Sequence, residues 1–242
     1  MSDIQTLPDP AAVAQVGAEQ FVTLAQAANT ERGQFNVALS GGSTPKAMFA
    51  LLTTDAYSQR VAWDKVHVFW GDERSVPPDD PDSNYRMARE AFLSHVPLPE
   101  ANIHRIESER PLEEAAQNYQ QTLRQHFGGA GFPRFDLILL GMGGDGHTAS
   151  LFPQTAALDE TNALTVPNFV PQLNTWRVTL TVPVINQARQ VTFLVVGAGK
   201  AERLHDVLRG THDPQRLPSQ LIAPTDGTLT WLLDQAAAAL LT

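Results

Sequence analysis

The segment FDLILLGMGGDGHTASLFP, residues 135–153, joins a nearly continuous apolar run to a glycine-rich loop. Such a run is typical of a strand buried on both faces of a sheet, so we expect a strand over residues 135–140. His147 is the only one of seven histidines that lies in a glycine-rich loop after an expected strand. Histidine is the usual general base at neutral pH, and a carboxylate nearby can orient its ring. We therefore predict that His147 and Asp145 are catalytic.

Apolar runs and helical patterns alternate on both sides of this segment. We expect strands over residues 35–40, 66–70, 135–140, 176–182 and 191–196, and helices over 9–29, 44–52, 83–96, 112–127 and 199–209. The run LTWLL near the end is expected to begin as a strand and to continue into a short Ala-rich helix. This alternation predicts an α/β fold with a Rossmann-like, mostly parallel sheet and helices on both faces. The chain contains no Ser/Gly linker or internal repeat, so we expect a single domain over residues 1–242.

Glycines gather where four of the expected strands end. Nine of the 16 glycines follow these apolar runs: Gly41, Gly42, Gly71, Gly141, Gly143, Gly144, Gly146, Gly197 and Gly199. Ligands of open α/β sheets bind outside the carboxyl ends of the strands, and glycine allows the backbone to approach them closely. One glycine turn would be an ordinary connection, whereas four turns with polar neighbours indicate a shared site.

Two of these loops have the composition of an anion site. SGGSTPK, residues 40–46, leads a strand into a helix, with Thr44 as the expected N-cap and Pro45 as the first helical residue. Free N–H groups of Gly41, Gly42, Ser43 and Thr44 at a helix start favour phosphate. In GAGKAERL, residues 197–204, Lys200 can add a positive charge, and Arg177 is a second candidate. An ordinary capped helix start and a solvated lysine remain the alternative readings.

A charged turn and a glycine motif add further candidates. Asp72 and Arg74 follow the strand over 66–70, where they can bind sugar hydroxyls and phosphate or can form a solvated turn. Gly141, Gly143 and Gly146 match GxGxxG, but Pro153 follows too soon for the helix of a dinucleotide site. The Walker, GxSxG, HExxH and EF-hand patterns are absent from the sequence. We therefore expect no cofactor and no metal.

Composition excludes several classes of protein. The net charge is −9, from 17 basic and 26 acidic residues, and no Lys/Arg-rich run is present, which argues against nucleic-acid and anionic-membrane partners. No apolar run approaches the length of a membrane span, and the sequence begins without a secretory signal pattern. The sequence contains no cysteine. We expect a cytoplasmic protein that binds a small molecule.

Five motifs together resemble a known family. SGGSTPKAMFALL, FWGDERSVPPDDPDSNYRMA, FDLILLGMGGDGHTASLFP, RVTLTVPVIN and GAGKAERL are similar, in this order, to those of the 6-phosphogluconolactonases. The resemblance extends from about residue 10 to DGTLTWLLD. It implies the fold of glucosamine-6-phosphate deaminase and hydrolysis of 6-phospho-D-glucono-1,5-lactone in the oxidative pentose phosphate pathway.

The resemblance also implies roles for the candidate residues. His147 would activate water with Asp145 nearby, and Gly143 and Gly144 would belong to the substrate loop. The phosphate would meet Ser43, Thr44, Arg177 and Lys200, with Asp72 and Arg74 lining the sugar or phosphate end.

Two alternative functions remain. A deaminase of this fold has a Glu just before the Pro of its DGHIAFNEP-like motif, whereas this chain has Phe152. A non-catalytic sugar-phosphate binder would not need His147 and Asp145.

We expect the protein to be a monomer, and the sequence does not exclude an oligomer.

Overall fold

The computed structural model describes residues 2–241 and contains one main sheet. Its six strands are all parallel, in the order β1-β9-β8-β5-β2-β3. Their bounds are β1 Asp3–Leu7, β2 Phe35–Leu39, β3 Val66–Trp70, β5 Leu137–Leu140, β8 Gln190–Val195 and β9 Thr228–Asp234. Every residue of β2, β5 and β8 is buried, as expected for central strands covered on both faces. The predicted α/β fold is confirmed.

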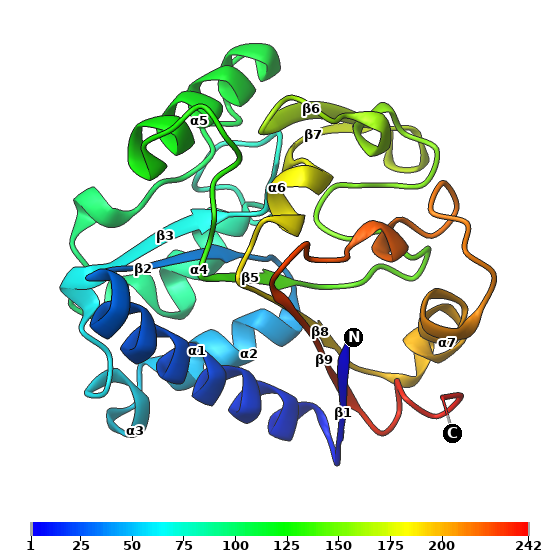
Figure 1. The fold of residues 1–242 in the computed structure, drawn as a ribbon, viewed down its shortest axis with the longest axis horizontal. Coiled ribbons are helices and arrows are strands. Elements are labelled where there is room, and N and C mark those ends of the chain that lie inside the picture. Colours follow the sequence, from blue (N-terminus) through cyan, green and yellow to red (C-terminus); the bar gives the residue numbers. More distant parts are fainter. Residues whose placement is uncertain (1, 242) are drawn as a thin grey trace.

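Helices cover both faces of this sheet (Figure 1). Their bounds are α1 Pro10–Arg32, α2 Ser43–Leu52, α3 Asp55–Ser58, α4 Asn84–Ala91, α5 Leu112–Phe127, α6 Val182–Asn186 and α7 Ala201–Arg209. Figure 1 shows α1 and α2 along one face, with α5 and α6 on the other side. The long helix α1 has clear local signals: Asp9 accepts a hydrogen bond from the Ala12 N–H at 2.8 Å, Pro10 is its first residue, and Gly33 ends it with φ 80°.

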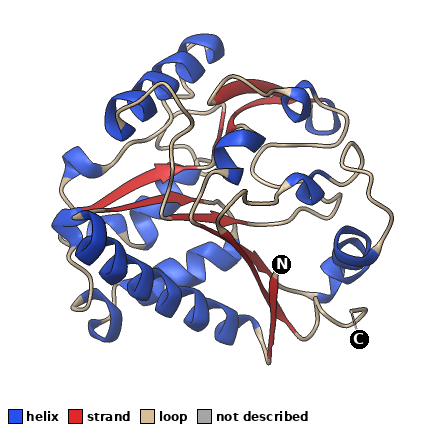
Figure 2. Cartoon of the chain, viewed as in Figure 1, coloured by secondary structure: helices blue, strands red, loops and turns tan. Residues whose placement is uncertain are grey.

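A second, smaller sheet stands apart from the main one (Figure 2). It consists of β4 Asp72–Arg74, β7 Thr175–Leu180 and β6 Thr165–Val170, paired antiparallel in that order. The strand expected over residues 176–182 is therefore present, but it does not belong to the parallel sheet. The first half of β7 is at least partly exposed and its second half, Val178–Leu180, is buried, so the strand enters the interior at its carboxyl end.

Three local expectations were wrong. Helix α2 begins at Ser43 with Gly42 as its N-cap, so Thr44 and Pro45 are the second and third helical residues. Gly42 has φ 107°, a conformation that favours glycine at this boundary. The helix expected over 83–96 ends at Ala91 and is followed by a 3₁₀ turn, Leu93–His95. Residues 235–240 form turns instead of the expected Ala-rich helix, and the backbone N–H groups of Ala237 and Ala238 both donate to Asp234 at the end of β9.

The strand order brings the four glycine-rich strand ends together. Strands β8, β5, β2 and β3 are consecutive neighbours in the main sheet. The chain leaves β2 toward its neighbour β3, whereas it leaves β5 toward β8, which lies on the other side of the sheet. The connections after β2 and β5 therefore run in opposite directions, and such a switch point opens a crevice at the carboxyl ends of the two strands.

Candidate active site

A cavity of about 310 Å³ lies at this switch point. Residues after β2, β3, β5 and β8 line it, as the glycine pattern predicts. Among the predicted site residues, the lining includes Gly41, Gly42, Ser43, Thr44, Asp72, Arg74, Gly143, His147 and Lys200. Asp145, Gly144 and Arg177 are not part of the lining, although Asp145 contacts His147 directly.

His147 and Asp145 form a hydrogen-bonded pair. Nδ1 of His147 is 2.5 Å from Oδ1 of Asp145, and the same oxygen accepts the backbone N–H of His147 at 3.1 Å. The loop is closed by the N–H of Gly143, which donates to the His147 carbonyl at 2.8 Å. With Nδ1 held by a carboxylate, the neutral ring carries its lone pair on Nε2. The arrangement has the geometry of a base and the group that orients it.

Asp145 is held in its ionised form. Partial burial alone would raise the pKa of its carboxyl group, but the hydrogen bond and the positive charge of protonated His147 outweigh burial and lower that pKa below its usual value. Asp145 is therefore an anion at neutral pH and can stabilise an imidazolium formed during reaction.

The ring of Phe152 packs flat against His147. The ring centroids are 3.9 Å apart and the ring planes differ by 21°. Phe152 is itself buried, so it fixes one face of the imidazole while Asp145 fixes its edge. The sequence placed Phe152 where a deaminase has a carboxylate, but gave no sign that it would touch the base.

The first turn of α2 borders the cavity. Ser43 and Thr44 open this helix, and Gly42 forms no side-chain cap for it. The first N–H groups of a helix have no acceptor within the helix and carry its positive dipole end. Two hydroxyls and these N–H groups are potential donors to an anion, and their role in binding one stays a prediction.

Asp72 lies in a buried hydrogen-bond network. It is 6% exposed, and its Oδ2 accepts the Ser150 hydroxyl at 2.6 Å. Asn84 Nδ2 donates to the Asp72 carbonyl at 3.0 Å and also lines the cavity. A Cβ at Gly41 would lie 2.0 Å from Asn84 Oδ1, so this close approach requires glycine. Sequence reasoning missed Asn84 and Ser150, since both are placed by contacts distant in the chain.

Glu73 organises the turn that carries Arg74. Its carboxylate accepts the backbone N–H groups of Arg74, Asn84 and Tyr85, each at 2.8 Å. Two of these groups belong to the first turn of α4, so Glu73 caps that helix from outside. Burial raises the pKa of Glu73, although the three backbone hydrogen bonds oppose this shift. Sequence reasoning also missed this residue.

Two arginines lie side by side next to the cavity. Arg74 and Arg177 are directly opposed in the β4–β7 pair. Partial burial lowers the pKa of Arg177, and the adjacent Arg74 adds to this effect. Arg74 donates to the Asp82 carbonyl at 2.7 Å. Within residues 2–241, the buried Nε atoms of both arginines have no hydrogen-bond partner. Two close cations with unused donors favour an anion.

Two backbone N–H groups of the 141–147 loop already have acceptors. The Gly143 N–H donates to His147, and the Gly146 N–H donates to the Gly143 carbonyl at 3.1 Å. These two N–H groups are therefore not free to bind a ligand, whereas the Arg74 guanidinium borders the cavity.

Comparison with known proteins defines the family. A family model described as glucosamine-6-phosphate isomerases/6-phosphogluconolactonase matches residues 8–231. The chain belongs to this family. A Synechocystis protein named 6-phosphogluconolactonase is 50% identical over 211 residues, which cover 86% of this chain and 85% of the relative.

Solved structures agree with this assignment. The 6-phosphogluconolactonase of Trypanosoma cruzi has a TM-score of 0.87 at 30% identity, with 100% of this chain and 97% of that chain covered. A monomeric glucosamine-6-phosphate deaminase has a TM-score of 0.81 at 20% identity and covers 98% of this chain and 99% of its own. The second match confirms the predicted deaminase-like fold. Within residues 2–241, no helix is both long enough and apolar enough to cross a membrane.

Proposed function

We propose that this protein hydrolyses 6-phospho-D-glucono-1,5-lactone to 6-phosphogluconate, a step of the oxidative pentose phosphate pathway. The observation that carries the proposal is the His147–Asp145 pair at a cavity lined by cationic groups and a helix N-terminus. The name of the Synechocystis relative supports the same reaction. The proposed substrate is a small sugar-phosphate lactone. Its phosphate needs cationic groups and its carbonyl needs a base to activate water, and both kinds of group meet in this cavity.

The cationic side of the cavity would hold the phosphate. Lys200 and Arg74 line the cavity together with the first turn of α2. Arg177 would act beside Arg74, where a dianion relieves the repulsion between the two guanidinium groups. With the phosphate fixed at one end, the lactone carbonyl is held near His147, and such positioning lowers the barrier before any proton moves.

His147 would act first as a base and then as an acid. Nε2 takes a proton from water while the water oxygen attacks the lactone carbonyl. The tetrahedral intermediate then breaks its bond to the ring oxygen, and the imidazolium returns the proton to that oxygen. Asp145 stabilises the imidazolium between the two steps. General acid–base help of this kind contributes about 10²–10⁴-fold to a rate.

The other reaction known for this fold is less suited to the site. Ring opening and amine protonation by a deaminase require a further acid–base group. The position before Pro153 holds Phe152, a buried apolar ring that stacks on His147. This contact favours the lactonase over the deaminase.

A His147→Gln variant tests the proposed base. We expect kcat for lactone hydrolysis to fall about 10²–10⁴-fold with KM little changed, because the phosphate contacts remain. The matched control is His212→Gln, at an exposed position away from the cavity. Wild-type kcat in a folded His147→Gln protein would eliminate the proposed role.

A further inference from the structure

Three of the seven histidines meet at a second place in the fold. One ring nitrogen from each of His67, His104 and His126 lies within 4.8 Å of the others. His67 belongs to β3, the edge strand of the main sheet, and His126 to the last turn of α5. His104 is fixed beside β3 because its backbone N–H donates to the Val68 carbonyl at 2.8 Å. Three separate elements thus bring imidazoles to one point.

The spacing of two of these rings matches a tetrahedral metal site. His67 Nδ1 and His104 Nε2 are 3.3 Å apart. Two nitrogens bound to Zn²⁺ at about 2.0–2.1 Å in tetrahedral geometry are separated by about 3.4 Å. A metal ion would replace the hydrogen bond between the two rings, and the donor ring would move its proton to its other nitrogen. No net proton release is needed for these two ligands.

The third ring is oriented by a group outside the cluster. His126 Nε2 is 2.6 Å from Asn36 Oδ1, an oxygen that can only accept, so this nitrogen carries the proton and Nδ1 keeps the lone pair. Asn36 is itself buried on β2, where its backbone N–H donates to Asp136 Oδ2 at 2.8 Å. Metal-binding histidines typically donate their second N–H to such a carbonyl.

Aromatic rings surround the cluster. The Phe69 ring stacks on His104 with centroids 4.4 Å apart, and Phe127 lies 5.0 Å from His126. Burial lowers the pKa of His104 and of His126 to about 4, and in each case a neighbouring histidine adds to the shift. A histidine binds a metal through a ring nitrogen that carries no proton.

We propose that His67, His104 and His126 bind one divalent transition-metal ion, with Zn²⁺ as the best fit and water as the fourth ligand. Strand β3 runs from Val66 to Trp70 and reaches the catalytic cavity only beyond its carboxyl end, so His67 lies near the opposite end. The ion would join β3, the 100–105 segment and α5, and would stabilise this edge of the sheet without taking part in lactone hydrolysis.

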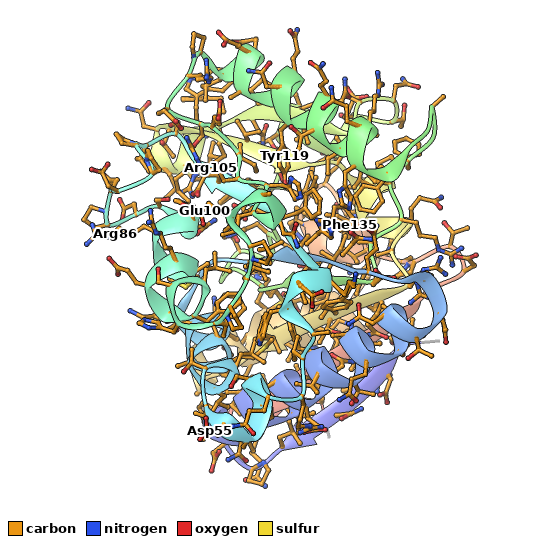
Figure 3. All side chains as sticks on the ribbon, turned by 90° about the vertical axis from the view of Figure 1, so that its left-hand side faces the viewer. Asp55, Arg86, Glu100, Arg105, Tyr119 and Phe135 are labelled. Atoms are coloured by element: carbon orange, nitrogen blue, oxygen red, sulfur yellow. The ribbon has the colours of Figure 1, made fainter. Side chains whose placement is uncertain are left out.

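The site can be reached from the surface. His104 borders a second cavity of about 310 Å³, whose lining also includes Glu100 and Glu107. Figure 3 views this side of the molecule and labels Glu100 and Arg105, between which His104 falls in the sequence, and Phe135, which packs against Phe69. All three histidines are partly exposed, so a hydrated cation can exchange its water for imidazole.

Titration of the untagged, metal-stripped full chain with Zn²⁺ at pH 7.5 tests the proposal. We expect one Zn²⁺ per chain, and at saturation a rise in Tm of about 5–10 °C. Co²⁺ in the same site should show the intense visible absorption of tetrahedral coordination. His104→Gln and His126→Gln should each weaken Zn²⁺ binding at least about 100-fold. Circular dichroism and the metal-free Tm of each variant establish that it is folded.

Two controls locate the bound ion. His212→Gln and His147→Gln should bind Zn²⁺ like the wild type, since neither residue belongs to the cluster. Hydrolysis of the lactone by the wild type should be equal with and without a chelator. Absence of stoichiometric Zn²⁺ binding by the wild type would overturn the proposal. Zn²⁺ binding that survives His104→Gln and His126→Gln but is lost in His147→Gln would also overturn it.

Discussion

Gly143 lies so close to His147 and Asp145 that no side chain fits there. A Cβ at this residue would be 2.1 Å from His147 Nδ1 and 2.6 Å from Asp145 Oδ1. We expect Gly143→Ala to displace the imidazole and to lower kcat for lactone hydrolysis at least 10-fold, because small errors in the position of a base are costly.

The neighbouring glycine provides the control. A Cβ at Gly144 meets no atom within 4 Å, so Gly144→Ala should keep near wild-type activity. Steady-state kinetics compares kcat of the two variants, and the Tm of each shows that it is folded. Equal kcat values for the two variants would show that the Asp145–His147 geometry is not what limits the rate.

Phe152, whose ring stacks on His147, is the second residue expected to position the proposed base. Phe152→Leu keeps the site apolar but removes the flat contact with His147. We expect kcat to fall several-fold while KM stays the same, because the phosphate contacts are elsewhere in the cavity. Phe169→Leu, at an exposed ring, is the control. A changed KM with unchanged kcat would mean that Phe152 contacts the substrate instead of orienting the base.

Among single residues, the sequence revealed those whose neighbours in the chain are distinctive. His147 and Asp145 could be found because they lie in a glycine-rich loop after a buried strand, and the structure joins them at 2.5 Å. Asn84 could not be found, because its hydrogen bonds to Asp72 and Glu73 place it at the cavity, and these contacts leave no local pattern in the sequence. The roles of His147 and Asp145 in catalysis stay predictions.

Helix α4 depends on a carboxylate that comes from another element. Glu73 on β4 accepts the N–H groups of Asn84 and Tyr85 in the first turn of α4. Glu73→Ala leaves these buried donors unsatisfied, and we expect a loss of about 2–3 kcal/mol in the free energy of unfolding. Because Arg74 and Asn84 lose their support, KM for the lactone should rise as well.

Denaturant unfolding and lactone kinetics check this expectation. Glu90→Ala is the matched control, since Glu90 lies on α4 but is exposed, and its carboxylate pairs with Arg86 at 2.7 Å. A Glu73→Ala protein as stable as the Glu90→Ala protein would contradict the capping role.

Elements with strong local signals were predicted well, and those that depend on distant partners were not. The Asp9, Pro10 and Gly33 signals lie at the two ends of α1, and the apolar runs mark β2, β5 and β8. Strand β4 has only three residues and exists because β7 pairs with it. A sequence pattern that short cannot reveal a partner about 100 residues away.

The whole molecule is acidic, although its proposed substrate is an anion. The net charge is −9, but the cavity presents Arg74, Lys200 and the first turn of α2. We expect Lys200→Ala to raise KM for the lactone about 10-fold and to weaken inhibition by inorganic phosphate, because one cation of the cavity is lost.

Lys46→Ala is the control for this change of charge. Lys46 lies on α2 close to the cavity but is exposed and does not line it, so its loss alters the net charge equally. If both variants change KM to the same extent, the general field of the protein and not a local contact attracts the phosphate.

At the scale of the molecule, alternating strands and helices indicated the α/β fold, and four glycine-rich strand ends indicated where its cavity lies. The strand order supplies the reason, because β8, β5, β2 and β3 are neighbours. The separate sheet of β4, β7 and β6 was not expected. Strand β6 was not predicted although it pairs with β7, the next strand in the chain, and β4 pairs with β7 from a distant part of the sequence. The single-domain organisation stays a prediction.

The central claim is that this site opens a phosphorylated lactone. The most direct measurement compares two reactions of the purified full chain: hydrolysis of freshly made 6-phospho-D-glucono-1,5-lactone, corrected for its spontaneous hydrolysis, and release of ammonia from glucosamine 6-phosphate. We predict rapid lactone hydrolysis that is lost in His147→Gln, with no release of ammonia. Ammonia release without lactone hydrolysis above the spontaneous rate would contradict the account.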